Sequence, residues 1–456
     1  MIADPDMLQR HAVARAQAGD HGGAEAAFRM ALALAPDGTR LWSNRGVAAR
    51  IAGDSRRQAA SLARAVMLNP ADLDLAADAA SALVETGRRD EAATAYAALL
   101  ARQPGHAAAR YNLAILRRAD GRLAEAADLL APLAFRMAQL QLAAVERQRG
   151  RLDQAAAAYL ALVTADAADA EGWAGLGSIR AMAGDADAAG RALARALALA
   201  PASAGWWADL GHLHRSPRPA EAIKSYARAA ALAPGDAVIA HHLAALTGQA
   251  TDHAPADYVA GLFDAYAERF DAELVGKLGY RVPDEIARLV AGLGRDLDVV
   301  DLGCGTGLCA AGLAPLARRL AGVDLSASML AQAARLDLYD DLVKADLATF
   351  LAGRPGAFDL AVAGDVFVYV GALDAVFAAL ATAVRPGGHV AFSVERDDGD
   401  GVALRPSGRF AHGDAYVEAT ATSAGFARRE QRDVVLRRDA GHPIRGRLYL
   451  YVRDER

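Results

Sequence analysis

The amino-acid sequence predicts two folds in succession: an α-solenoid of helix pairs, then an α/β domain with a mostly parallel sheet. Two observations support this prediction. From residue 297 onwards, apolar segments of strand length alternate with helical ones, which is typical of a parallel sheet covered by helices. Before that, turn glycines and prolines recur at a fixed step of 34 residues, at Gly19, Gly53, Gly87, Gly121 and at Pro36, Pro70, Pro104. A period of that length is typical of stacked repeats.

Composition limits the class of protein. The 456 residues exceed one typical domain, and 54% hydrophobic with 23% charged residues is a globular balance. A net charge of −5 argues against a general affinity for nucleic acid or anionic membrane. The N-terminal segment resembles no secretory signal, and no run of about 18 apolar residues occurs. We therefore expect a cytoplasmic protein.

Each repeat holds two apolar-periodic segments of helical length, separated by the glycine turn and ended by proline. One helix pair cannot bury its apolar face alone, so neighbouring pairs must stack. We predict that residues 1–247 form about six to seven such repeats, with residues 236–247 as a closing helix. The repeat near 123–150 departs from the pattern because Pro132 ends its second helix early. We expect a degenerate repeat there.

The repeats resemble the tetratricopeptide (TPR) family. The best match places family signature residues at Trp173, Leu176, Gly177, Ala189, Ala196 and Pro201. The resemblance implies a concave face that binds a protein or peptide. First-helix residues that would face it include Asn44, Arg45, Asn112 and Arg180. Each of these could equally lie on a solvated helix face.

Residues 248–256 are polar and contain proline, so we predict a linker. The α/β domain then spans 257–456, with a helical lead-in at 257–294. Strands are expected at 298–302, 319–324, 342–344, 358–364 and 388–395. Helices are expected at 308–317, 328–336, 371–384 and 413–424. The last two apolar stretches, 432–437 and 446–452, have no helix between them, which indicates an antiparallel hairpin at one edge of a seven-stranded sheet.

The segment VVDLGCGTG, residues 299–307, marks the candidate ligand site. A strand that runs into a glycine-rich turn and a helix can hold a ligand, because glycine permits tight turns and close approach. The spacing G-x-G-x-G differs from the G-x-G-x-x-G of dinucleotide folds, and no Lys-Ser/Thr follows as in a P-loop. Cys304 at a helix start could have a lowered pKa and be reactive. The simpler interpretation is a small side chain in a tight turn.

These residues resemble motif I of the class I S-adenosylmethionine-dependent methyltransferases, which have a Rossmann-like sheet. Asp324 lies nineteen residues after Gly305 and matches the acidic residue that binds both ribose hydroxyls. Asp346 matches the position that meets the adenine amino group, with Leu347 near the ring. FDLAVAGDVFVYV, followed by RPGG, matches the fourth strand and the turn before the fifth. With FDAYAERFD, GYRVP and RFAH, the chain looks like bacterial predicted methyltransferases that carry N-terminal TPR repeats.

The resemblance implies S-adenosyl-L-methionine as the cofactor. The candidate cofactor-binding residues are Asp301, Gly303, Cys304, Gly305, Gly307, Asp324, Leu325, Met329, Asp346, Leu347 and Asp365. Tyr266 and Phe270 of the lead-in lie on an apolar stripe and either pack in the core or cap the adenosine. An ionised carboxylate at a strand end can accept hydrogen bonds from two adjacent ribose hydroxyls. Holding a nucleophile in line with the methyl group can supply roughly 7–11 kcal/mol of barrier lowering.

The methyl acceptor is less clearly indicated. The chain lacks the Asn/Asp-Pro-Pro-Tyr/Phe turn of methyltransferases that act on DNA bases or glutamine amides, and Asp365 stands in its place. Asp365 is a candidate catalytic residue because ligand and acceptor would meet there. Segments that could overhang the pocket carry Tyr369, Glu395, Arg409, His412 and Tyr416. Of these, His412 is the best candidate for a general base, although a lone histidine is also an ordinary surface residue.

Three functions remain open on the sequence alone. The first is an enzyme that methylates a protein or peptide recruited by the TPR face. The second is a small-molecule methyltransferase whose repeats serve partner assembly, and the third is a non-catalytic TPR adaptor. No metal-ligand cluster is expected in either half, and the sequence leaves the oligomeric state open.

Overall fold

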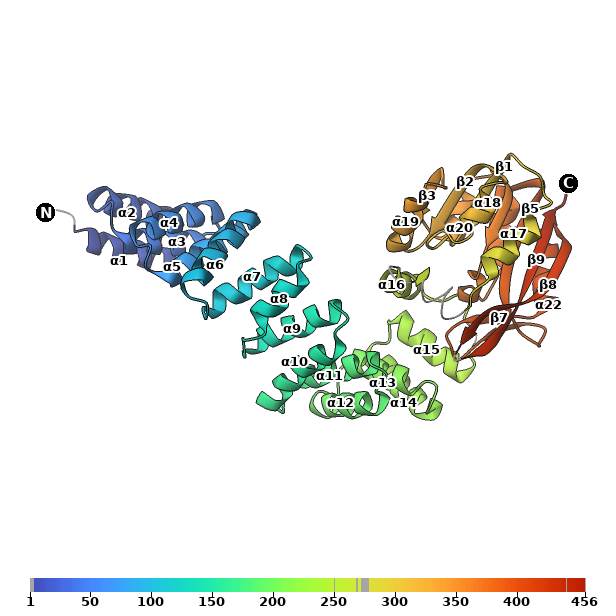
Figure 1. The fold of residues 1–456 in the computed structure, drawn as a ribbon, viewed down its shortest axis with the longest axis horizontal. Coiled ribbons are helices and arrows are strands. Elements are labelled where there is room, and N and C mark those ends of the chain that lie inside the picture. The colour runs from blue at the N-terminus through green and yellow to red at the C-terminus, as the bar shows by residue number, and fades with distance from the viewer. Residues whose placement is uncertain (1–3, 250, 268–269, 272–278, 440, 456) are drawn as a thin grey trace. The chain divides into compact units, whose positions relative to one another are not determined.

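The computed structural model describes residues 4–249, 251–267, 270–271, 279–439 and 441–455. The chain divides into two compact units, Met1–Pro201 and Ala202–Arg456, and each is described by itself (Figure 1). No described helix is both long and apolar enough to cross a membrane.

The first unit consists of helices that follow one another in antiparallel pairs. They are α1 (Pro5–Gln17), α2 (His21–Leu34), α3 (Thr39–Ile51), α4 (Ser55–Leu68), α5 (Leu73–Glu85), α6 (Arg89–Arg102), α7 (Ala107–Ala119), α8 (Leu123–Leu130), α9 (Arg136–Gln148), α10 (Leu152–Ala165), α11 (Ala170–Met182) and α12 (Ala186–Leu199). The degenerate repeat is confirmed: α8 has 8 residues, where α6 and α10 have 14.

The recurring Gly-Asp turn forms the corner of a helix pair. Gly19 has φ +80, a left-handed conformation that glycine adopts without steric cost. The next residue, Asp20, then caps α2, because its carboxylate accepts from the Gly23 N–H at 2.9 Å. Asp54 and Asp185 cap α4 and α12 in the same way. The left-handed glycine recurs at every one of these turns, whereas α6, α8 and α10 follow Arg88, Arg122 and Arg151, which provide no side-chain cap.

The second unit begins with three further helices of the repeat type, α13 (Ala204–His214), α14 (Pro219–Leu232) and α15 (Ala237–Thr247). The expected closing helix is α15, and it packs on the α/β part of the same unit. His241 Nε2 lies 2.9 Å from the Gly408 carbonyl oxygen, and the His242 ring meets Tyr258 edge-on at 5.0 Å. Two lead-in helices follow, α16 (Ala256–Tyr266) and α17 (Val282–Val290).

The sheet contains β1 (Leu297–Leu302), β2 (Ala317–Asp324), β3 (Asp341–Lys344), β4 (Phe358–Ala363), β5 (Val384–Arg396), β6 (Val402–Leu404), β7 (Phe410–His412), β8 (Phe426–Asp439) and β9 (His442–Arg453). Its order is β3-β2-β1-β4-β5-β7-β6, and β9 joins it by pairing with both β5 and β8. Strands β1 to β5 pair in parallel, while β8 and β9 pair antiparallel. The mostly parallel sheet with an antiparallel hairpin is confirmed.

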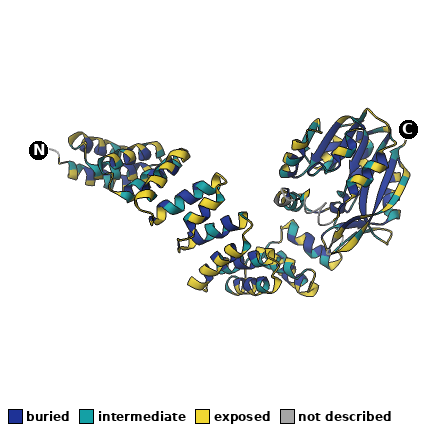
Figure 2. Cartoon of the chain, viewed as in Figure 1, coloured by how far each residue is buried: buried dark blue, intermediate teal, exposed yellow. Residues whose placement is uncertain are grey.

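Successive residues of β1 face opposite sides of the sheet, as the two-residue period of a strand requires. Val299 packs with Ile286 of α17 and with Leu313 of α18 (Ala310–Leu313). Val300 packs on the other face, in a cluster that includes α20 (Leu347–Ala352), α21 (Asp374–Ala383) and α22 (Asp414–Ser423). Figure 2 shows the central strands largely buried, as in β1 and β4, whereas β8 is largely exposed. The remaining helical segments are α19 (Ala327–Ala333), η2 (Ala334–Leu336) and η3 (Phe367–Tyr369).

Two sequence-based expectations were wrong. The sheet has nine strands among the described residues where seven were expected, because β6 and β7 have three residues each and carry no recognisable period. The expected helix at 308–317 is α18, which has only 4 residues. Proline cannot donate a backbone hydrogen bond, so Pro315 ends the helix and β2 starts at Ala317. A helix this short adds little dipole to the glycine turn.

Candidate active site

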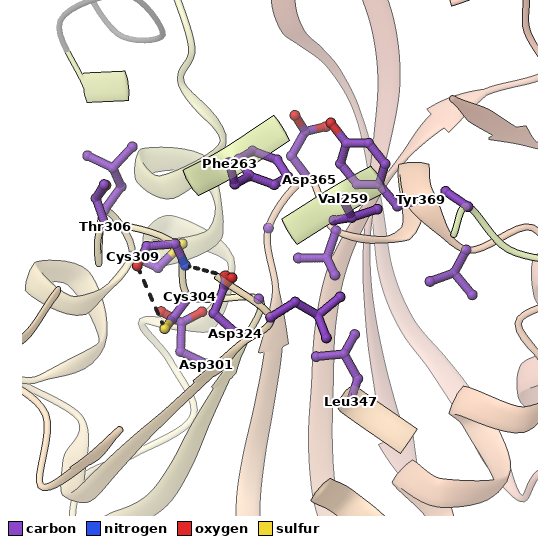
Figure 3. A pocket seen from close by; sticks show the side chains of 18 of the residues that line it. Val259, Phe263, Asp301, Cys304, Thr306, Cys309, Asp324, Leu347, Asp365 and Tyr369 are labelled. Carbon is purple, nitrogen blue, oxygen red and sulfur yellow. Dashed lines mark hydrogen bonds between the residues drawn. The ribbon is translucent and has the colours of Figure 1, made fainter. Parts of the chain in front are cut away.

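A cavity of about 260 Å³ lies at the carboxyl ends of β1, β2 and β4 (Figure 3). Ligands of open parallel sheets bind at this edge. Its lining comprises His253, Ala254, Ala256, Val259, Phe263, Phe270, Tyr280, Asp301, Gly303, Cys304, Gly305, Thr306, Leu308, Cys309, Asp324, Leu325, Asp346, Leu347, Gly364, Asp365, Val366, Tyr369, Val370 and Arg409. The structure thus brings together most of the residues that the sequence marked.

The glycine turn is shaped by close contacts. Gly303 has φ +63, and a Cβ there would stand 2.6 Å from a methyl group of Val366. Gly307, at φ +91, would meet Leu336 at the same distance, but it does not line the cavity. Gly303 and Gly305 border the cavity directly, whereas Gly307 closes the turn.

Asp324 ends β2 and faces the cavity. One carboxylate oxygen accepts from the Gly305 N–H at 2.9 Å and the other from the Ser326 N–H at 2.8 Å. Burial raises the pKa of Asp324, and these backbone donors oppose the rise. A carboxylate has about four lone-pair positions, so the group can still accept a hydrogen bond from a ligand.

Asp301 on β1 is almost completely buried beside the glycine turn. Its Oδ2 accepts from the Tyr339 hydroxyl at 2.6 Å. Burial raises the pKa of Asp301 to about 7; Tyr339 opposes the rise and the neighbouring Asp324 adds to it. Two acidic groups therefore meet at the ends of adjacent strands, where a cationic or hydroxyl-bearing ligand would stabilise their charge.

The two cysteines lie in the cavity wall, and both are buried. Burial raises the pKa of both Cys304 and Cys309, and the Asp301 carboxylate adds to the effect. A lowered pKa at Cys304 is therefore contradicted, since no helix dipole or cation offsets its desolvation. The small-side-chain interpretation holds for this residue.

After β3 the chain places Asp346 and Leu347 in the cavity lining. Asp346 also caps α20, because its carboxylate accepts from the Thr349 N–H at 3.0 Å. Leu325 lines the cavity after β2. Met329, in contrast, is fully buried in α19 and is not part of the lining, so the structure does not place it at the ligand.

Helix α16 contributes Val259 and Phe263 to the lining. It is tied across the site by Asp264, whose Oδ1 accepts from the Ser326 hydroxyl at 2.5 Å and the Ser328 N–H at 3.2 Å. Phe270 lines the cavity as well, and its ring meets Phe263 edge-on at 5.8 Å. The side chain of Tyr266 lies outside what the structure describes, so its role in capping the adenosine stays a prediction.

Asp365 lines the cavity from the loop after β4, on the opposite side from Asp301 and Asp324 in Figure 3. Its φ of +59 is unusual for a residue other than glycine, and such strain often marks functional sites. Both carboxylate oxygens bind Arg437, at 2.8 and 2.9 Å. The second guanidinium nitrogen of Arg437 binds Glu395. Asp365 is thus held in place by its ion pair with Arg437.

His412 does not line the cavity. Its ring is fully buried, and Nε2 lies 2.9 and 3.1 Å from the carbonyl oxygens of Val370 and Gly371. Nε2 therefore carries the proton and donates it. Burial lowers the pKa of His412 to about 4. This placement corrects the general-base assignment: the ring ties β7 to the loop before α21.

Several lining residues had only weak sequence signals. Arg409 and Tyr369 had been marked merely as residues on overhanging segments, whereas His253, Phe263 and Tyr280 had no assigned role. His253 and Val370 form an isolated bridge between the linker and the loop after η3. Only the chain path across the sheet edge brings these residues to the cavity, which no local pattern encodes. Among the described residues, no group of three or more His, Cys, Asp or Glu is arranged to hold a metal ion.

Comparisons with known proteins agree with this architecture. The profile of the family described as "Methyltransferase domain" matches residues 300–392, and that of "Tetratricopeptide repeat" matches 77–134 and 140–204. The ubiquinone biosynthesis O-methyltransferase of Thiobacillus denitrificans is 37% identical over 102 residues, 21% of this chain and 43% of that protein. A protein of the same name from Burkholderia thailandensis is 36% identical over 99 residues, again 21% and 43%. The chain thus spans less than half of the length of these relatives.

Solved structures give weaker likenesses. A tetratricopeptide repeat protein from Parabacteroides merdae is 20% identical, over 53% of this chain and 98% of that chain, with a TM-score of 0.37. The N-methyltransferase NodS from Bradyrhizobium japonicum, solved with S-adenosyl-L-homocysteine, is 21% identical over 38% and 85%, with a TM-score of 0.32. The chain thus contains segments that match the tetratricopeptide repeat profile, followed by a segment of the α/β part that matches the methyltransferase domain profile.

Proposed function

We propose that this protein binds S-adenosyl-L-methionine in the cavity and transfers its methyl group to an acceptor that enters beside Asp365. The observation that carries the proposal is the pair of buried carboxylates, Asp301 and Asp324, at the ends of adjacent strands around the glycine turn. Their unfavourable burial suits a ligand with an ammonium group and two ribose hydroxyls. Leu325 and Leu347 supply apolar surface for the adenine ring.

Each residue has a distinct task in this function. Asp324 accepts from the ribose hydroxyls, and Asp301 accepts from the ammonium group. When bound, the cofactor supplies an electrophilic methyl group. Helix α16, tied down by Asp264, excludes water from the cavity through Val259 and Phe263. The ion pair of Asp365 with Arg437 keeps the acceptor side of the cavity rigid.

Calorimetry with S-adenosyl-L-homocysteine tests cofactor binding. Asp324→Asn should weaken binding by about tenfold or more, because charged hydrogen bonds to the ribose are lost. Asp400→Asn, at an exposed position away from the cavity, is the matched control and should leave the affinity unchanged. Equal affinities of the two variants would contradict the proposed site. Failure of the unaltered protein to bind would favour the adaptor function instead.

The acceptor that we propose is a protein or peptide recruited by the repeats. Support comes from a groove of about 450 Å³ on α11 and α12, lined by Trp173, Leu176, Arg180, Ala188, Arg191, Ala192 and Arg195. Within the described part of the chain, none of its three arginines has an ion-pair partner. An acidic segment with an apolar side chain would complement such a groove.

Labelled cofactor added to a native lysate tests this proposal, with the label sorted into protein and metabolite fractions. Reversing the charge of Arg180, Arg191 and Arg195 to Glu should abolish protein labelling and leave cofactor affinity intact. The same reversal at Arg89, Arg147 and Arg151, exposed arginines elsewhere in the first unit, is the control. Equal labelling by both triple variants would argue against recruitment at this groove.

A small-molecule acceptor is the second candidate. The observation in its favour is the name of the relatives, ubiquinone biosynthesis O-methyltransferases. In that case the label appears in the metabolite fraction, and the arginine reversals leave turnover unchanged.

A further inference from the structure

We propose that Arg409 holds a carboxylate of the methyl acceptor, whose apolar body lies against the aromatic wall of the cavity. This inference rests on the proposed function, since it concerns the acceptor side of the same cavity. It names the chemical class of the acceptor: an apolar group that carries a single carboxylate.

Arg409 lies in a fixed place at the cavity. It immediately precedes β7 and lines the cavity beside Tyr369, with its guanidinium carbon 5.8 Å from the centre of the Tyr369 ring. The turn that carries it is held from both sides: the Arg405 N–H donates to the Arg409 carbonyl at 2.8 Å, and His241 contacts the Gly408 carbonyl. The backbone is therefore preorganised to present this side chain.

The charges around Arg409 leave it without a carboxylate of its own. Burial lowers the pKa of Arg409, but Tyr369, Asp365 and Glu395 together raise it above its usual value. The two carboxylates are both bonded to Arg437. Across the described residues, no carboxylate oxygen forms an ion pair with Arg409. A cation that faces a largely apolar cavity is costly unless it is paired. A carboxylate from outside the chain would complete the pairing through a forked hydrogen bond.

The rest of this wall is apolar. Val259, Phe263 and Phe270 come from the lead-in, and Tyr369 and Val370 from the loop after β4. The rings of Phe263 and Tyr369 meet edge-on at 5.6 Å, which leaves flat apolar surface toward the cavity. One guanidinium that has the Tyr369 hydroxyl but, among the described residues, no carboxylate as a partner suits a singly charged carboxylate better than a doubly charged phosphate. The wall therefore fits an aromatic or aliphatic carboxylic acid.

Binding of paired probes to the full-length protein, saturated with S-adenosyl-L-homocysteine, tests the inference. The first pair is phenylacetate and phenylacetamide, which differ mainly in charge. The second pair is a blocked Phe-Glu dipeptide and its Phe-Gln counterpart, which present the same difference on a peptide. In at least one pair the acid should bind about tenfold more tightly than the amide. A preference in the first pair indicates a free acid as acceptor, and one confined to the second indicates an acidic residue of a peptide.

Variants assign the preference to Arg409. Arg409→Gln should remove it, Arg409→Lys should keep it in part, and Arg438→Gln on the exposed hairpin should leave it unchanged. Unaltered affinity for S-adenosyl-L-homocysteine shows that each variant is folded; if Arg409→Gln lacks it, the comparison rests on Arg409→Lys and the unaltered protein. Equal binding of acid and amide in both pairs overturns the inference, as does a preference that survives in a folded Arg409→Gln. If S-adenosyl-L-homocysteine itself does not bind, the proposed function fails instead.

Discussion

Asp301 is a carboxyl group whose pKa lies at about 7 because burial opposes its ionisation. An unfolded aspartate titrates near 4, so the folded protein holds this proton more tightly between about pH 4 and 7. The contribution of Asp301 to stability therefore falls as pH rises through that window and is constant above it. A bound ammonium group would stabilise the ionised form and release the proton.

The affinity for S-adenosyl-L-homocysteine should consequently rise with pH, by up to about tenfold per unit below pH 7, and level off above it. Calorimetry from pH 5.5 to 8.5 in buffers of different ionisation enthalpy measures both the affinity and the proton release. In Asp301→Asn the profile should flatten, because the titrating group is gone. A profile that is unchanged in this variant would mean that another buried acid, such as Glu395, controls the binding.

Gly303 has two separate reasons to be glycine, its φ of +63 and its contact with Val366. Gly303→Ala should lower the free energy of unfolding by about 2–4 kcal/mol, the sum of backbone strain and overpacking. Gly356→Ala is the matched control: its φ is +59, but a Cβ there meets nothing within 4 Å, so about 1 kcal/mol is expected. Denaturant unfolding measures both. Equal losses would show that Val366 moves aside.

Helix α16 lines the cavity, and Asp264 links it by hydrogen bonds to the start of α19. The Ser326 hydroxyl donates to Asp264 and accepts from the Met329 N–H, so removing Asp264 leaves the cap of α19 intact. Asp264→Ala should weaken cofactor binding by about fivefold and speed hydrogen exchange across residues 256–266. Asp257→Ala, in the exposed first turn of the same helix, should change neither. Faster exchange in both variants would indicate a general loss of helix stability.

The elements that sequence predicted well are those with a repeated physical signal. Recurring turn glycines mark the helix pairs, and long apolar runs mark β1, β4 and β5. Short elements escaped prediction: β7 has three residues, yet it positions Arg409 and buries His412. His412 was predicted as a candidate base because its neighbours in the sequence give no sign that it is buried. Its burial depends on contacts with Val370 and Gly371, 42 and 41 residues earlier in the chain. Contacts of that kind have no trace in local sequence.

At the scale of the whole molecule, the boundary between the two compact units determines which truncated chains should fold on their own. The sequence indicated a linker at 248–256, but the compact units meet between Pro201 and Ala202. Helices α13 to α15 therefore belong to the same compact unit as the α/β part, although their sequence is of the repeat type. The reason lies in α15, where His241 and His242 contact Gly408 and Tyr258. Truncation after residue 201 or after residue 247 distinguishes the boundary of the compact units from the boundary predicted by the sequence.

Two truncated chains should behave differently. Removal of residues 1–201 should leave cofactor affinity and the thermal midpoint of the remaining unit unchanged. Removal of residues 1–247 should lower that midpoint by about 5–10 °C, because Tyr258 and Phe410 lose the apolar contacts made by α15. Calorimetric melting with and without S-adenosyl-L-homocysteine measures both effects. If the two chains melt alike, α15 does not stabilise the α/β part and the boundary lies at the linker.

If the repeats recruit the acceptor, removal of residues 1–201 alone already abolishes protein labelling, because the groove on α11 and α12 is lost while the cavity stays intact.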